Sequence, residues 1–116
     1  MKSNALLATD EAGSLALGAG TPAVGHGIVS RTVLATAELR ATWFNFAAGQ
    51  SLTEHTSTSR ALIQVLSGAG EFSVAGVPRT LRAGDLLHLP PCTPHAVNAT
   101  EPMTMLLVLA PERKAK

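Results

Sequence analysis

Apolar and polar positions alternate along most of the chain, and glycine or proline interrupts the apolar runs roughly every eight to twelve residues. That spacing is typical of an all-β sandwich or barrel. The pattern predicts strands at 28–34, 39–46, 61–66, 71–74, 77–81, 86–89, 95–98 and 103–109. No convincing stretch has helical periodicity, so we expect a protein built from strands.

Within two of these strands, the alternation also indicates which side chains share a face. Trp43 and Asn45 point to one side of their strand and Phe44 to the other, although the pattern does not show which side lines the barrel. In 86–89, Leu87 and Leu89 share one face. If those leucines point inward, His88 points outward, and we favour that structural role for it. Ala75-Gly76 predicts a tight hairpin in which the glycine supplies a positive φ.

The predicted barrel covers 28–110, between a weakly patterned, Ala/Gly-rich arm at 1–27 and a flexible, charged tail at 111–116. All three belong to one domain, as a chain of 116 residues allows. No apolar run approaches the roughly 20 residues that a membrane span requires. We expect a cytoplasmic protein that does not contact a membrane.

Composition narrows the possible functions. Hydrophobic residues make up 46% of the chain and charged residues 15%, which excludes a disordered protein. The net charge is +1 and no basic stripe is present, so we expect no binding to nucleic acid. Cys92 is the single cysteine, which excludes an internal disulfide or a zinc site made of cysteines alone.

Two histidines stand where strands begin or resume after turns. His55 follows the turn that starts at Gly49, and His95 follows the proline-rich loop 90–94. Because proline fixes the backbone φ, this loop holds His95 on a rigid approach. An imidazole held in this way can act as a metal ligand or as an acid and base. Alternatively, each histidine caps a strand or packs at the mouth of the barrel.

The spacing around these histidines resembles the two conserved motifs of the cupin superfamily. Three residues match the first motif and three match the second: Gly49, His55 and Gly68, then Gly84, Pro90 and His95. The resemblance covers about residues 28–110. It implies a small, single-domain conserved-barrel cupin, which is a double-stranded β-helix or jelly-roll barrel.

The sequence departs from these motifs at the metal site. The resemblance implies a complete site of three histidines and a glutamate around Mn, Fe, Ni or Zn. In this sequence, Ser57 and Ala61 stand at the positions of one histidine and of the glutamate. Only His55 and His95 remain as ligands. We therefore expect any divalent metal to be weakly held, with water completing its coordination sphere. Cys92 occupies a glycine position of the second motif. A soft thiolate ligand is conceivable there, but a small, buried hydrophobic residue is the favoured interpretation.

We expect a small, mostly apolar ligand pocket with the two imidazoles and a hydroxyl at one end. The candidate lining residues are Ser57, Ala61, Trp43, Phe44 and Met105, and core packing is the alternative for Met105. His26 lies between two glycines in the arm, where it could fold over the barrel mouth, although a plain loop residue is the favoured interpretation.

Two functions remain open, at nearly equal weight. The first is an enzyme acting on a small molecule, for which the resemblance implies dioxygenase, isomerase or lyase chemistry. His55 and His95 would then be metal ligands or a proton-transfer pair. The second is a non-catalytic ligand-binding, sensor or scaffold barrel without metal.

In either case we expect a homodimer in which the edge strand 28–34 and the arm cross to the partner. The alternative is a monomer whose arm folds back on its own barrel.

Overall fold

A computed structural model describes residues 5–17 and 24–112. The strands in these ranges are β1 (Ile28–Ala35), β2 (Arg40–Phe46), β3 (Ser51–His55), β4 (Ser59–Ser67), β5 (Ala69–Val74), β6 (Val77–Arg82), β7 (Leu86–Leu89), β8 (His95–Ala99) and β9 (Met103–Pro111). The all-β prediction is therefore confirmed. The described ranges contain no helix long and apolar enough to cross a membrane. Of the predicted arm and tail, residues 1–4, 18–23 and 113–116 lie outside these ranges.

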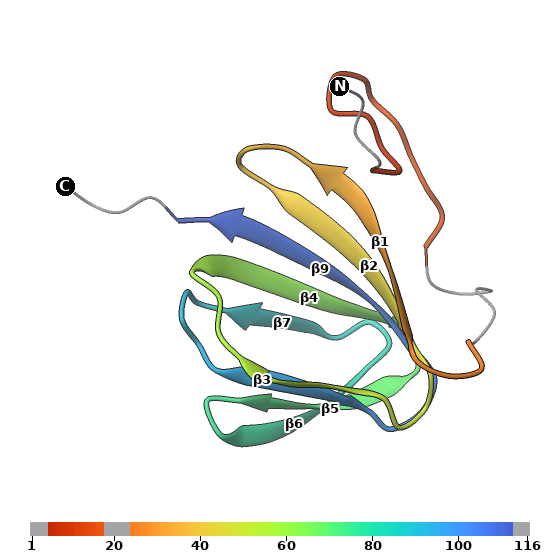
Figure 1. The fold of residues 1–116 in the computed structure, drawn as a ribbon, viewed down its shortest axis with the longest axis vertical. Helices are drawn as coiled ribbons and strands as arrows, with labels where there is room; N and C mark the ends of the chain where they lie inside the picture. Colours follow the sequence, from red (N-terminus) through yellow and green to blue (C-terminus); the bar gives the residue numbers. More distant parts are fainter. Residues whose placement is uncertain (1–4, 18–23, 113–116) are drawn as a thin grey trace.

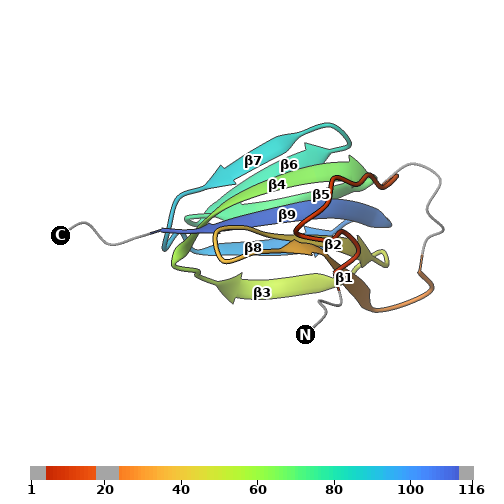
Figure 2. The ribbon, with the colours of Figure 1, turned by 90° about the horizontal axis from the view of Figure 1, so that it is seen from above.

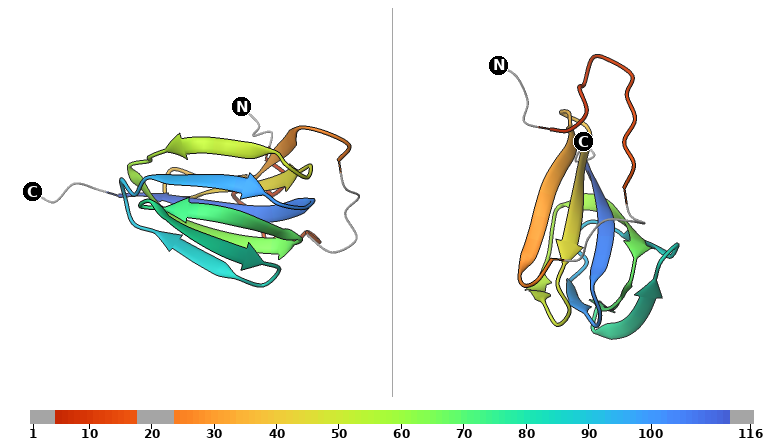
Figure 3. Two further views of the ribbon diagram at one scale, coloured as in Figure 1. Left: turned by 90° about the horizontal axis from the view of Figure 1, so that it is seen from below. Right: turned by 90° about the vertical axis from the view of Figure 1, so that its right-hand side faces the viewer.

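The strands form two antiparallel sheets that pack face to face. One sheet has five strands in the order β1-β2-β9-β4-β7, and Figure 1 shows them side by side. The other has four strands in the order β3-β8-β5-β6, which Figure 3 shows in front in its left view. Seen from above in Figure 2, strands distant in sequence, such as β4 and β9, lie next to each other. This crossing between sheets is the jelly-roll arrangement.

The hydrophobic core lies between the two sheets. The largest fully buried side chains are Phe46, Phe72, Ile63, Leu89, Met103, Met105 and Val65. Strand β4 shows how the sequence places them, because its residues alternate between buried and exposed from Arg60 to Val65. Burying one such side chain stabilises the fold by about 1.5–3 kcal/mol, so the inward face of each strand fixes its register.

The faces of β2 and β7 follow the predicted alternation. Phe44 and Phe46 point into the core and stack on each other, with ring centroids 5.9 Å apart. Trp43 therefore lies on the outer face of the five-stranded sheet. In β7, Leu87 is buried and His88 is exposed, so the inward parity of the leucines and the outward position of His88 are confirmed.

The sequence pattern missed one strand. The pattern predicts no strand between Gly49 and 61–66, but residues 51–55 form β3. Leu52 is the one apolar side chain of this edge strand, and Ser51, Thr53 and Glu54 are exposed. A strand with a single buried position has no detectable hydrophobic alternation.

The arm pairs with the edge of its own barrel. β1 is an edge strand, as predicted, and the N–H groups of Leu6 and Leu7 donate to the carbonyls of Thr32 and Val33 at 3.0 and 2.8 Å. The described part of the arm thus protects the free backbone groups of β1. Within the single described chain, the arm therefore folds back on its own barrel, and its crossing to a partner chain stays a prediction.

Candidate functional site

His55 and His95 come together from neighbouring strands of the four-stranded sheet. His55 ends β3, His95 begins β8, and the two residues are directly paired in the antiparallel register. Their ring centroids are 4.2 Å apart, with the ring planes at 61°. The convergence expected from the two motifs is therefore confirmed.

A β-bulge turns the exposed ring of His55 toward the mouth of the pocket. Between its pairs with Val97 and His95, β3 has one residue more than β8. Leu52 and His55 are three residues apart, so a regular strand would place them on opposite faces. The bulge allows both to point inward, which is how bulges commonly aim a side chain at a site. Glu54 is exposed, and it does not line the pocket beside His55.

Backbone carbonyls determine the tautomer of both imidazoles. Nδ1 of His55 lies 2.9 Å from the carbonyl oxygen of Thr53, and Nδ1 of His95 lies 2.8 Å from that of Thr93. A carbonyl oxygen can only accept, so both Nδ1 atoms carry the proton and donate it. In the neutral form, each Nε2 then has a free lone pair. No described residue donates to either Nε2.

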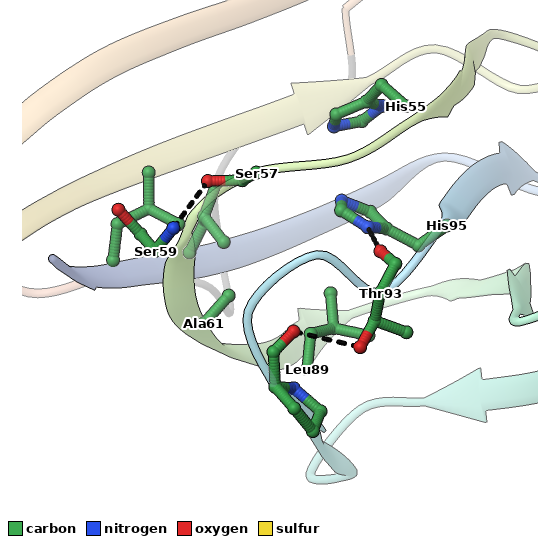
Figure 4. Close-up of a pocket in the computed structure, with 10 residues that line it drawn as sticks. His55, Ser57, Ser59, Ala61, Leu89, Thr93 and His95 are labelled. Atoms are coloured by element: carbon green, nitrogen blue, oxygen red, sulfur yellow. Dashed lines mark hydrogen bonds between the residues drawn. The ribbon is translucent and has the colours of Figure 1, made fainter. Parts of the chain in front are cut away.

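A cavity of about 190 Å³ opens beside the two rings, between the inner faces of the sheets. Figure 4 shows the imidazoles at one side of it, with Ser57 and Ala61 across from them. Its described lining is His55, Ser57, Ser59, Ala61, Leu89, Pro90, Thr93, His95, Leu107 and Leu109. Apolar side chains form most of the wall, and none of these residues is Lys, Arg, Asp or Glu.

The loop after β7 holds one wall of this pocket. The hydroxyl of Thr93 donates to the carbonyl of Pro90 at 2.8 Å, and the N–H of Cys92 donates to the carbonyl of Ser57 at 2.7 Å. The second bond joins the His95 loop to the bend between β3 and β4. Ser57 Oγ in turn accepts from the N–H of Ser59 at 3.1 Å, so its own proton remains available to a ligand.

The structure divides the predicted pocket residues into two groups. Ser57 and Ala61 line the pocket, but Trp43, Phe44 and Met105 do not. Met105 is fully buried in the core, Phe44 packs against that core, and Trp43 faces the opposite side of the sheet. These three assignments are corrected, because the pocket lies further along β9, toward its C-terminal end.

Six lining residues were not predicted: Ser59, Leu89, Pro90, Thr93, Leu107 and Leu109. Leu107 and Leu109 have the same parity as Met105, so extending the alternation along the last strand would have found them. Leu89 and Ser59 face the pocket through strand pairings that close only in the fold. The alternation places Ser59 on the face of Ala61 and Leu89 on the face of Leu87, but it does not show that this part of each face meets a pocket.

The remaining histidines and the cysteine lie outside the pocket lining. His26 is exposed and does not cover the pocket. His88 lies on the outer face, where its Nε2 is 2.9 Å from Nη1 of Arg60, whose other nitrogens bond Glu112. Cys92 is exposed, so the favoured interpretation of a small buried hydrophobic residue is wrong. It has φ 66° in the turn of the loop, a conformation that favours the glycine of the motif.

The donor set fits a metal ion only partly. In residues 5–17 and 24–112, no group of three or more His, Cys, Asp or Glu side chains could hold a metal. The two free Nε2 atoms can supply two ligands, but the Ser57 hydroxyl is a poor third at neutral pH. A divalent ion bound here would therefore take most of its remaining ligands from water or substrate.

The fold is a jelly-roll barrel, and His55 at the end of β3 pairs with His95 at the start of β8. These two features define the class of this protein. A sequence model of the family described as "Cupin domain" matches residues 42–109. The chain therefore belongs to the cupin family. No curated protein matches the chain.

Several solved structures share the fold. A conserved protein of unknown function from Streptococcus pyogenes is 26% identical, with a TM-score of 0.82 and 98% of each chain covered. An RmlC-like cupin protein from Desulfovibrio desulfuricans is 30% identical, with a TM-score of 0.77, covering 87% of this chain and 98% of that one. KdgF from Halomonas sp. is 30% identical, with a TM-score of 0.71, covering 76% of this chain and 82% of its own.

Proposed function

We propose that this chain binds a small molecule in the pocket beside His55 and His95. One observation carries the proposal: two imidazoles with fixed tautomers, 4.2 Å apart, share the wall of a cavity of about 190 Å³. A concave, mostly apolar site with a few convergent polar groups is the usual form of a small-molecule site.

We further propose that the two Nε2 atoms hold a divalent metal ion (Mn, Fe, Ni or Zn) weakly. Hydrogen bonds from Nδ1 to carbonyls orient the rings of metal-binding histidines in many proteins, and both rings have such a bond here. Two protein ligands leave the remaining coordination positions open. An ion held in this way would polarise a bound oxygen and supply Lewis-acid chemistry.

If the site is catalytic, dioxygenase, isomerase or lyase chemistry fits it best. His55 and His95 would serve as the ligands or, without metal, as a proton-transfer pair, because each neutral Nε2 can accept a proton from a substrate. Ser57 would orient a substrate oxygen by donating a hydrogen bond from its hydroxyl group to that oxygen. The apolar wall of Leu107 and Leu109 would exclude water from one side of the ligand.

The second candidate is a non-catalytic ligand-binding, sensor or scaffold barrel. It is favoured by the replacement of two metal-ligand positions with Ser57 and Ala61, and by a described pocket lining without a carboxylate. In that case, the histidine pair positions a ligand but does not transform it. Metal-dependent turnover of any bound compound would decide between the two candidates.

The metal proposal can be tested by titration. Protein purified without a metal-affinity tag should contain less than one equivalent of metal by elemental analysis, and should bind added Zn²⁺ or Mn²⁺ in calorimetry. His55→Phe and His95→Phe should each abolish this binding. His88→Phe, a histidine on the outer face, is the matched control and should leave it intact. Metal that survives prolonged dialysis against a chelator would show a stronger site than the one proposed.

We also propose that the protein is a cytoplasmic homodimer that contacts its partner through the outer face of the five-stranded sheet. On that face, Val29 in β1, Leu62 in β4 and Leu86 in β7 are 42%, 41% and 62% exposed. Apolar patches of this kind are usually interfaces, and two-fold dimers are the commonest assembly. A sedimentation mass near 12 kDa would refute the dimer. Leu86→Glu should dissociate it, whereas Val77→Glu on the other sheet should not.

A further inference from the structure

The pocket imidazoles offer acceptors to a ligand and no donors. Because both Nδ1 protons are bonded to the carbonyls of Thr53 and Thr93, each neutral ring presents a lone pair at Nε2. With the ring centroids only 4.2 Å apart, these two acceptors are neighbours. A ligand with two donors close together matches this pair of acceptors.

Ser57 adds the opposite requirement. Its Oγ already accepts from the N–H of Ser59, so its proton is the part that a ligand can use. A hydroxyl is the simplest neutral group that donates to an imidazole and also accepts from Ser57, since an ammonium or an amide nitrogen cannot accept. The polar end of the pocket therefore favours hydroxyl groups.

With both imidazoles neutral, the described pocket lining offers no charged side chain to a charged ligand. An ionised carboxylate would face two lone pairs, with no Lys or Arg in the lining to neutralise it, and an ammonium would find no carboxylate. Burying an unpaired charge against Leu89, Leu107 and Leu109 would be costly. The volume of about 190 Å³ lies below the usual range for drug-sized ligands and fits a single small ring or a short chain.

We infer that the metal-free pocket binds a small neutral molecule that has hydroxyl groups on two adjacent carbon atoms and a compact apolar body. One hydroxyl donates to Nε2 of the half-buried His95 and the other to Nε2 of His55 at the mouth. The body packs against the leucines. This ligand class rests on the pocket proposed above, but not on its metal.

A set of cyclohexane derivatives tests the inference, using ¹⁵N-labelled full-length protein in chelator-treated buffer. The probe is cis-1,2-cyclohexanediol, and the comparisons are its dimethyl ether, cyclohexanol and cyclohexanecarboxylate. Losing one neutral hydrogen bond should weaken binding about threefold for cyclohexanol. Losing both should weaken it about tenfold for the ether. The diol should shift the amide signals of Ser57 and Leu109, while the Trp43 indole signal, on the outer face, should not move.

Two substitutions separate the acceptor role from metal binding. His95→Phe keeps a flat ring without the acceptor and should weaken the diol about threefold, to the level of cyclohexanol. His95→Gln restores an acceptor near the Nε2 position, so it should recover diol binding. Long-range nitrogen spectra of the wild-type protein should show both rings protonated at Nδ1.

Other outcomes would overturn the inference. Equal affinity for the diol and its dimethyl ether would show a pocket that binds by shape alone, and the small-molecule site would stand without its donor requirement. Tighter binding of the carboxylate would show that an anion is preferred. If no probe binds without metal, the ligand class is wrong, and the metal titration then judges the proposed function independently.

Discussion

Replacing Cys92 with glycine should stabilise the protein, because this residue occupies a backbone conformation that favours glycine. Its φ is 66°, in the left-handed region, where an L-residue's Cβ crowds the following carbonyl at a cost of about 1–2 kcal/mol. The thiol is exposed, so its removal takes away little packing. The hydrogen bond from the Cys92 N–H to the carbonyl of Ser57 uses only the backbone and is kept.

The expected gain is the difference between two effects. Relief of the left-handed conformation gives about 1–2 kcal/mol, and the greater freedom of glycine in the unfolded chain removes about 0.5–1 kcal/mol. The free energy of unfolding should therefore rise by about 0.5–1 kcal/mol. For a domain of this size, that corresponds to an increase in Tm of about 2–5 °C.

Urea unfolding and thermal melting under reducing conditions measure this change, with Cys92→Ala as the matched control. Alanine removes the sulfur but keeps the Cβ, so it should leave the unfolding free energy within about 0.5 kcal/mol of the wild type. A Cys92→Gly protein less stable than the wild type would refute the reasoning. So would an equal change in both variants, because the thiol and not the backbone would then decide stability.

Three further tests, two of them with a control substitution, probe a glycine turn, the core and the site. Gly68→Ala should lose at least about 2 kcal/mol, because a Cβ there would lie 1.9 Å from the carbonyl oxygen of Pro102 at φ +74°. Gly76→Ala, at φ +81° in open space, is the control and should lose only about 0.5–1 kcal/mol in urea unfolding. Phe46→Ala should lower the free energy of unfolding by about 3–5 kcal/mol, since the Phe46 side chain is 0% exposed. Val77 is 55% exposed, so Val77→Ala should change this free energy by less than about 0.5 kcal/mol. Similar losses in the two variants would contradict the assigned core. Ser57→His should raise Zn²⁺ affinity roughly a hundredfold in calorimetry, because four-ligand zinc sites bind with about 10–16 kcal/mol, or about 3 kcal/mol per ligand. Unchanged affinity would mean that position 57 does not face the proposed ion.

The outer apolar face and the pocket lie on opposite sides of the five-stranded sheet. Strand β9 contributes Leu107 and Leu109 to the pocket, and its alternate residues point to the face proposed as the dimer contact. Substitutions at the two surfaces can therefore be made independently, and a change at Leu86 should leave ligand binding unaltered.

Much of this fold was readable from the sequence by local rules. The inward parity of β7 follows from the period-two alternation, which one buried face enforces. The hairpin at Ala75-Gly76, with φ of 50° and 81°, follows from the positive φ that a two-residue turn needs. The motif spacing also placed His55 and His95 together. These features depend on residues close in sequence, or on family motifs that encode the barrel.

The tertiary structure alone decided the rest, because the deciding contacts join residues far apart in the chain. β3 became a strand by pairing with β8, and its bulge, invisible in the sequence, turned His55 inward. Whether Trp43 or Phe44 faced the core depended on which side of β2 the second sheet covers. The left-handed turn at Cys92 exposed a thiol expected to be buried. The free Nε2 lone pairs, finally, depend on the carbonyl oxygen that each Nδ1 meets, and the folded backbone sets that geometry.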